Sequence, residues 1–234
     1  MKSGQRKSWQ KPGNIFLALL IPALLTFHFS THPFATELAG RSINLSAYSA
    51  PHRQNFASAL ARLDGTVIKP GQTFSFNQKL GERTSRGGYV PAPGYLGNDR
   101  FATSGGGICL ISSNLYQLAL LSGLDIVERS NHVRPVSSVA PGLDATVWYG
   151  SQDLRLKNNL PYPVEISSRI EGNFAYMKIL GKAGLKPIKR RLERKEIARD
   201  NRTCLVEVYL LSSETENGSP ETRLVSRDCY RIGR

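Results

Sequence analysis

A run of three glycines that leads straight into an apolar helix limits the folds open to this chain more than any other feature. The run reads Ser104-Gly105-Gly106-Gly107-Ile108-Cys109. Glycine lets the backbone adopt conformations closed to other residues and approach a ligand closely. The free N–H groups of a first helical turn favour an anion or a thiolate. His132, the only histidine after this run, follows in Asn131-His132-Val133-Arg134-Pro135. We therefore expect the chemistry of the chain near Cys109 and His132.

The helix after the glycine run is predicted from its apolar spacing. Apolar residues recur at intervals of three and four from Ile108 and stop before Gly123, a typical C-cap. Cys109, Ser112 and Ser113 fall on a neighbouring face of the same helix. The pattern indicates a helix that buries one side and presents a polar row on another.

The remaining periodicities predict an α+β fold. Before the glycine run we expect a linker or a loosely packed entry strand at 36–51, a helix at 54–63, a hairpin at 66–76 and a long ordered loop at 81–97. After the helix, strand-like runs follow at 125–128, 145–149, 154–156, 164–170 and 174–180. Helices followed by strands favour helices packed on an antiparallel sheet. A papain-like or transglutaminase-like core is one version of this arrangement, and a small C-terminal β-hairpin follows it.

The N-terminal residues predict export from the cytoplasm. Four cations precede the apolar stretch Ile15–Phe29, which is short for a membrane-spanning helix and long enough for a signal sequence. A signal peptide and an uncleaved membrane anchor stay open as alternatives, because no clear cleavage site follows the stretch. We divide the chain into this leader at 1–35, an α+β domain at 36–183, and a basic linker with a hairpin at 184–234.

The charge of the chain favours anionic partners. Lysine and arginine number 31 against 18 acidic residues, a formal net charge of +13. Such an excess attracts an anionic membrane surface or a wall polymer. The basic segment between Lys186 and Arg202 is interpreted as a solvated strand or linker. We expect no nucleic acid as partner, because the chain is exported and this segment lacks interleaved aromatic residues.

Two of the three cysteines are predicted to pair. Cys204 and Cys229 flank strand-like runs at 205–211 and 223–227, which a polar turn joins. Folding this hairpin places the two cysteines nearly opposite each other, so a disulfide is favoured in an oxidising compartment. Two unpaired thiols are the alternative. A disulfide here leaves Cys109 as the odd thiol, a pattern that suggests a reactive residue.

Cys109, His132 and Asp144 form the strongest catalytic hypothesis. A helix N-terminus and a nearby histidine stabilise a thiolate, and an aspartate can orient the imidazole. Arg134 would hold a substrate anion through its planar guanidinium. Structural alternatives stay open for each: a thiol that packs a helix start, a histidine bonded to its own loop, and an aspartate bonded to backbone.

We expect no metal and no cofactor. Cys109, His132 and Asp144 lack the spacing of a zinc site. The glycine run lacks the Lys-Ser/Thr that a phosphate loop needs. Neither zinc nor a nucleotide is therefore predicted to bind.

Several motifs, in order along the chain, resemble the VanW family. They are Pro70-Gly71-Gln72-Thr73-Phe74-Ser75-Phe76-Asn77, Gly105-Gly106-Gly107-Ile108-Cys109 with Ser112-Ser113, His132-Val133-Arg134-Pro135-Val136, and Asp144-Ala145-Thr146-Val147 through Asp153-Leu154-Arg155-Leu156-Lys157-Asn158. The resemblance covers about residues 55–180. This family is associated with glycopeptide-resistance gene clusters and the bacterial cell envelope. The resemblance thus implies an extracytoplasmic protein, secreted or membrane-anchored, without implying a particular reaction.

One position departs from the family motif, in which glutamine usually follows the cysteine. This chain has Leu110 there. If the glutamine amide stabilises an oxyanion, its loss costs about 3 kcal/mol of transition-state stabilisation. A module that binds without catalysis therefore stays open beside an enzyme.

Two hypotheses follow. The first is a cysteine-centred hydrolase or transferase acting on peptidoglycan or its peptide, with Cys109 as nucleophile, His132 as base, Asp144 as orienting group and Arg134 as anion clamp. Further substrate contacts are expected from Gly105, Gly106, Gly107, Ser112, Ser113 and Tyr89. The second is a non-enzymatic module that binds a cell-wall peptide or a protein partner through Arg134, Tyr89 and Tyr95.

Overall fold

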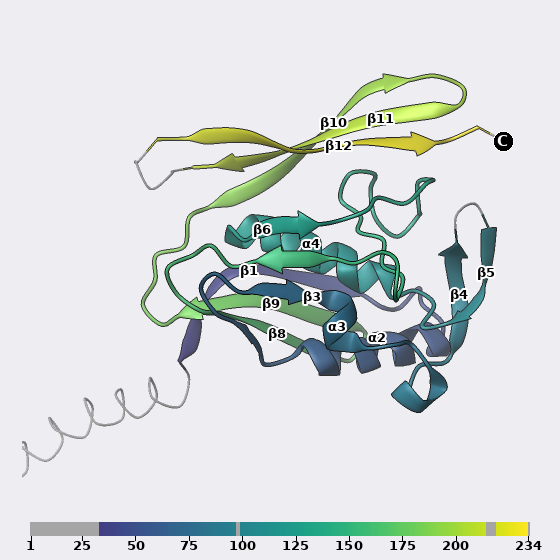
Figure 1. Ribbon diagram of the computed structural model, residues 1–234, viewed down its shortest axis with the longest axis horizontal. Helices are drawn as coiled ribbons and strands as arrows, with labels where there is room; N and C mark the ends of the chain where they lie inside the picture. The colour runs from purple at the N-terminus through teal and green to yellow at the C-terminus, as the bar shows by residue number, and fades with distance from the viewer. Residues whose placement is uncertain (1–32, 97–98, 214–218, 234) are drawn as a thin grey trace, which may run out of the picture.

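The computed structural model describes residues 33–96, 99–213 and 219–233, and there the chain is built mainly of antiparallel strands (Figure 1). The main sheet has the order β1-β9-β8-β2. Its strands are β1 (Phe34–Asn44), β2 (Thr66–Ile68), β8 (Val164–Glu171) and β9 (Phe174–Lys182). Along β8 and β9 buried residues alternate with exposed or half-buried ones, as expected of a sheet with one face in the core.

Two smaller sheets flank the main one. β3 (Thr73–Ser75), β7 (Arg155–Lys157) and β6 (Asp125–Glu128) form a three-stranded sheet in the order β3-β7-β6. β4 (Pro91–Leu96) and β5 (Asp99–Ser104) form a hairpin that projects at one end of the molecule (Figure 1). The short helix α3 (Phe76–Leu80) and a 3₁₀ turn at Ser85–Gly87 lie between β3 and β4.

Two longer helices pack against the main sheet. α2 (Ala50–Leu63) lies against β8, and α4 (Cys109–Ser122) lies against β1 and β9. α4 ends at Gly123, which adopts the left-handed conformation with φ of 88°. The prediction that this helix exposes a polar row is wrong, because α4 is buried along almost its whole length. Its polar side chains are satisfied by hydrogen bonds to backbone carbonyls instead, as Asn114 is by Leu110.

The C-terminal residues form a separate three-stranded layer. β10 (Arg190–Arg199), β11 (Thr203–Ser212) and β12 (Glu221–Arg231) pair in the order β10-β11-β12. Figure 1 shows this sheet lying over α4 and β6. The basic segment is thus a strand for much of its length, one of the two alternatives predicted for it. β12 is also tied to the loop after β6, since the Arg231 N–H donates to the carbonyl oxygen of Val133 at 2.8 Å.

The predicted fold class was wrong. In the described residues strands dominate over helices, and they form four separate antiparallel sheets. Of the two alternatives expected at 36–51, the entry strand is confirmed, because this stretch contains most of β1, an edge strand of the main sheet. The expected hairpin at 66–76 does not form, because β2 pairs with β8 and β3 pairs with β7. The described chain is therefore mostly antiparallel β, with two longer helices on one of its sheets, and not the expected α+β arrangement of one sheet covered by helices with a papain-like or transglutaminase-like core.

Several single helices and strands were predicted correctly. The helix expected at 54–63 is the larger part of α2, and the strands expected at 125–128, 164–170 and 174–180 are confirmed as β6, β8 and β9. The loop expected at 81–97 contains β4. The strand expected at 145–149 is absent, and this stretch makes only isolated bridges.

The predicted disulfide is contradicted, since Cys204 and Cys229 are both free. Beside their turn, β11 and β12 pair in a register that, if it continued unchanged along both strands, would place Cys204 opposite Cys229. An irregularity between Val208 and Tyr209 shifts the register by one residue, so Cys204 pairs with Tyr230 instead. Because successive strand residues point to opposite faces, Cys204 is buried and Cys229 is exposed.

The predicted leader falls on residues that the structure does not describe, apart from positions 33–35. Among the helices of the described residues, none has the length and apolar character needed to cross a membrane.

The glycine run is shaped by close packing. Gly105 and Gly107 have φ of 76° and 90°, the left-handed region that favours glycine. Gly106 has no such φ, but a Cβ there would overlap the carbonyl oxygen of Ala92 in β4. The run therefore turns the chain into α4 while the β4–β5 hairpin lies directly against it.

The packing of β4 against Gly106 should make this position intolerant of a side chain. Gly106→Ala should lower the free energy of unfolding by about 2–3 kcal/mol, because a backbone oxygen cannot move aside as a side chain can. Urea unfolding followed by circular dichroism measures the change. Gly87→Ala is the control, since its nearest backbone neighbour, the oxygen of Glu82, lies 3.3 Å from the added Cβ. Equal and small effects at both positions would contradict the packing described.

Candidate functional site

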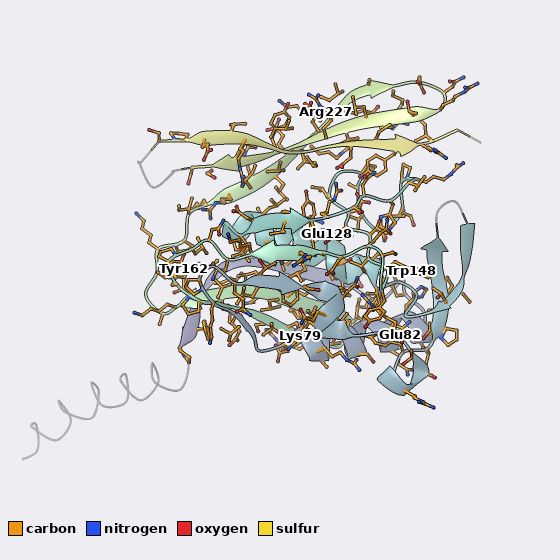
Figure 2. The ribbon with its side chains drawn as sticks, in the orientation of Figure 1. Lys79, Glu82, Glu128, Trp148, Tyr162 and Arg227 are labelled. Carbon is orange, nitrogen blue, oxygen red and sulfur yellow. The ribbon has the colours of Figure 1, made fainter. Side chains whose placement is uncertain are left out.

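A cavity of about 900 Å³ opens beside the start of α4. Its lining includes the glycine run, Cys109 and His132, so the two residues that the sequence singled out face one space. Glu82 and Trp148, labelled in Figure 2, also line it, at the end of the molecule near β4. The cavity is large enough to hold a short peptide or a comparable ligand.

Cys109 is the first residue of α4. Its sulfur lies 3.8 Å from the carbonyl oxygen of Val147, and its side chain is half-buried. Among the hydrogen bonds of the described residues, none uses the backbone N–H of Cys109. A free N–H at a helix start is a donor for a negative charge that develops beside the thiol.

Two serines hold the start of α4 against the segment that carries Asp144. Ser112 Oγ donates to the carbonyl oxygen of Ala145 at 2.6 Å, and Ser113 Oγ accepts from the Ala145 N–H at 2.9 Å. Ser113 Oγ also donates to the carbonyl oxygen of Cys109 at 2.5 Å. Both serines are buried and neither lines the cavity, so they position Cys109 rather than contact a substrate.

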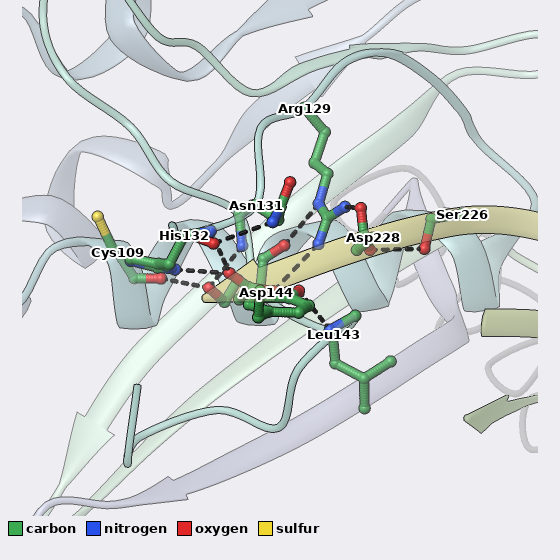
Figure 3. A network of polar contacts seen from close by, with 12 residues as sticks. Cys109, Arg129, Asn131, His132, Leu143, Asp144, Ser226 and Asp228 are labelled. Atoms are coloured by element: carbon green, nitrogen blue, oxygen red, sulfur yellow. Dashed lines mark hydrogen bonds and ion pairs between the residues drawn. The ribbon is translucent and has the colours of Figure 1, made fainter. Parts of the chain in front are cut away.

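Asp144 is the centre of a buried polar network (Figure 3). Only 1% of the residue is exposed, and its carboxylate accepts four hydrogen bonds. The donors are the His132 N–H at 2.7 Å, His132 Nδ1 at 2.6 Å, Tyr230 Oη at 2.6 Å and Arg129 Nη2 at 3.1 Å. Burial opposes ionisation, but the bonds from His132 and Tyr230 and the charge of Arg129 hold the pKa of Asp144 below its ordinary value.

His132 lies between Asp144 and Cys109. Because an ionised carboxylate can only accept, His132 Nδ1 carries the proton of its bond to Asp144, and Nε2 is left for the side of the thiol. Burial works against protonation of the ring. The hydrogen bonds with Asp144 and Cys109 and the charges of both outweigh it and raise the pKa of His132 to about 9. The imidazole is therefore protonated at neutral pH.

The C-terminal sheet completes this network. Arg129 Nη1 donates to Asp228 Oδ1 at 2.5 Å, and the guanidinium lies 5.0 Å from the centre of the Tyr116 ring of α4. Asp228 and Tyr230 are alternate residues of β12, so they point to the same face and reach the loop between β6 and Asp144 together. Burial and the neighbouring Asp144 raise the pKa of Tyr230, which keeps its hydroxyl a donor.

Sequence reasoning missed Arg129, Asp228 and Tyr230. Their only local signal is the i, i+2 spacing of Asp228 and Tyr230 on one strand. That spacing indicates a shared face but not which loop the face meets.

Other predicted contact residues lie elsewhere. Tyr89 is fully buried under Arg62, whose guanidinium lies 5.1 Å from the ring centre, and it does not line the cavity. Arg134 does not line the cavity either, although Val133 beside it does. The side chain of Tyr95 lies outside the described part of the structure. Leu110, at the position of the family glutamine, is buried in the hydrophobic core and borders the cavity.

The structure brings in two cavity residues that the sequence did not indicate. Arg83 lines the cavity beside the glycine run. His52 lines it as well, held by Ser49 Oγ at 2.8 Å and the carbonyl oxygen of Pro93 at 2.9 Å. Across the described ranges, no group of three or more His, Cys, Asp or Glu side chains is placed to hold a metal ion.

Comparison with known proteins identifies the family of the chain. A model of the VanW like protein family matches residues 52–180. The uncharacterized protein YoaR of Bacillus subtilis is 40% identical over 148 residues, 63% of this chain and 48% of YoaR. The vancomycin B-type resistance protein VanW of Enterococcus faecalis is 34% identical over 110 residues, 45% of this chain and 40% of that protein.

These matches span less than half of either relative's own length. No solved structure matches the chain. The family model covers the glycine run, Cys109, His132 and Asp144 but ends before β12, so Asp228 and Tyr230 lie outside it. Because that model matches more than half of the sequence, the chain belongs to the VanW family.

Proposed function

We propose that this chain is an extracytoplasmic cell-envelope protein that uses Cys109 to cleave or transfer an amide of peptidoglycan or its peptide. The observation that carries the proposal is that Cys109 and His132 line one cavity, while the buried carboxylate of Asp144 accepts from His132 Nδ1 at 2.6 Å. Basic charge before the apolar stretch at 15–29 supports export. The resistance named for the relative from Enterococcus faecalis supports a role at the cell wall.

The reaction would proceed in two steps. The Cys109 thiolate attacks the carbonyl carbon of an amide, and the carbon–nitrogen bond breaks as His132 Nε2 gives its proton to the leaving amine. The resulting thioester is then attacked by water, or by an amine in a transfer reaction. His132 accepts the proton of that nucleophile, and the thiolate leaves. Asp144 holds the imidazole in the required tautomer throughout.

The developing oxyanion would be stabilised by groups other than residue 110. Leu110 has no donor, and its side chain is part of the hydrophobic core. The N–H of Cys109 at the helix start, which bonds to no acceptor among the described residues, is a candidate donor. Gln152, whose side chain makes no hydrogen bond with other described residues, lines the same cavity and supplies an amide.

A binding module remains the second candidate function, and Leu110 is the observation that favours it. The cavity would then hold a cell-wall peptide without cleaving it. Cys109→Ser separates the two, because a module keeps its binding and its biological effect with serine, whereas an acyl-transfer enzyme loses turnover.

Thiol labelling tests the proposed nucleophile. With limiting iodoacetamide at pH 7, Cys109 should react about 10-fold or more faster than the exposed Cys229, because the helix start and His132 beside it activate the sulfur for attack. Mass spectrometry of the labelled peptides measures both rates in one sample. His132→Ala should remove the excess, while His52→Ala, in the same cavity, should leave most of it. A labelling rate of Cys109 that is the same in wild type and His132→Ala would contradict the proposal that Cys109 is the nucleophile.

The raised pKa of His132 predicts a pH-dependent stability. A folded pKa of about 9 against an ordinary value of 6.5 means that His132 stabilises the fold fully below about pH 6.5. This contribution is lost as the pH rises through 9. The loss amounts to about 3 kcal/mol. Urea unfolding at pH 6 and pH 10 should show the unfolding free energy of the wild type falling toward that of His132→Gln. A difference between the two proteins that stays constant across this range would contradict the assignment.

A further inference from the structure

The side chain of Arg83 lines the same cavity as Cys109 and carries a positive charge. Its guanidinium donates from Nη2 to Asn77 Oδ1 at 2.6 Å and from Nη1 to the carbonyl oxygen of Gly81 at 3.2 Å. Both acceptors are neutral. A guanidinium has five N–H groups, so most of its donors stay unused by the described residues.

No carboxylate neutralises Arg83 in the part of the chain that the structure describes. The charge of Asp153 acts on Arg83, but the Asp153 oxygens accept from Ser75 Oγ at 2.5 Å and from the Asn77 N–H at 2.8 Å. Glu82 lines the same cavity, but among the ion pairs of the described residues none joins it to Arg83. Burial lowers the pKa of Arg83, which means that its charge is poorly solvated. An anion entering the cavity would relieve this cost.

The position of Arg83 is fixed from several sides. Its guanidinium lies 5.7 Å from the ring centre of Phe76 and 5.9 Å from that of Tyr149. A Cβ at Gly105 would come within 2.6 Å of the Arg83 Cβ, so the glycine run leaves room for this side chain. Asn77, its acceptor, also donates to the carbonyl oxygens of Trp148 and Gln152. These contacts hold the guanidinium of Arg83 in one position.

We propose that Arg83 forms a carboxylate-binding subsite, and that the substrate at Cys109 is a peptide whose free carboxylate lies close to the amide attacked. A planar guanidinium matches a carboxylate with two parallel hydrogen bonds. The subsite takes the role that the sequence assigned to Arg134. The substrate assignment rests on the proposed function, whereas the presence of an anion subsite does not.

Two alkylating reagents that differ in one group test the subsite directly. Iodoacetate carries a carboxylate and iodoacetamide does not, and both label thiols. The ratio of the iodoacetate rate to the iodoacetamide rate at Cys109, divided by the same ratio at Cys229, isolates the effect of the cavity. Arg83→Gln should lower this quotient at least 5-fold, and Arg83→Lys should lower it less.

Arg62→Gln is the matched control. Arg62 also donates to backbone carbonyls and stacks on a ring, but it does not line the cavity. Its replacement should leave the quotient unchanged. The same quotient in wild type and Arg83→Gln would overturn the subsite.

A binding measurement decides the proposal even where Cys109 proves unreactive. In the Cys109→Ser protein, calorimetry would compare Nα-acetyl-D-alanyl-D-alanine with its C-terminal amide. We expect the acid to bind at least 10-fold tighter than the amide, and Arg83→Gln to abolish the difference while circular dichroism shows an intact fold. Absence of a preference for the acid, including absence of binding, would overturn the proposal. Low reactivity of Cys109 with both reagents would instead count against the nucleophile alone.

Discussion

The buried carboxylate of Asp144 is the interaction on which the arrangement of this site depends. An ionised carboxylate is costly to bury unless several donors satisfy it. Here the donors are His132 and Arg129 of the loop after β6 and Tyr230 of the C-terminal sheet. Removing any of them leaves a buried charge with too few partners. The loop after β6 and the strand β12 are therefore held in one geometry by a single carboxylate.

The glycine run and the two serines place the thiol within that geometry. The run brings the chain tightly past β4 and into α4, where Gly106 admits no side chain. Ser112 and Ser113 then fix the first turn of α4 to Ala145, the residue after Asp144. The family motif thus combines residues that face the cavity with residues that only hold it in shape. Arg83, which the sequence did not indicate, adds a positive charge to the cavity, and no carboxylate of the described residues forms an ion pair with it.

Local pattern predicted single elements well and their assembly poorly. Apolar spacing located α4 and its Gly123 cap, because a helix is stabilised by residues close in sequence. It could not place β1 beside β9, or separate β2 from β3, because those pairings join residues far apart along the chain. The disulfide prediction failed on one register shift in β11–β12. Cys109, His132 and Asp144 came from motif chemistry, whereas Arg83 and Tyr230 reach the site only through tertiary contacts.

The central claim is that Asp144 keeps His132 charged beside Cys109. Nitrogen-15 NMR titration of the imidazole, with His132→Gln used to assign its signals, measures this most directly. We predict a midpoint near pH 9 in the wild type and a fall toward the ordinary value in Asp144→Asn, which removes the carboxylate charge and keeps the size. A wild-type midpoint near 6.5, unchanged by Asp144→Asn, would contradict the account.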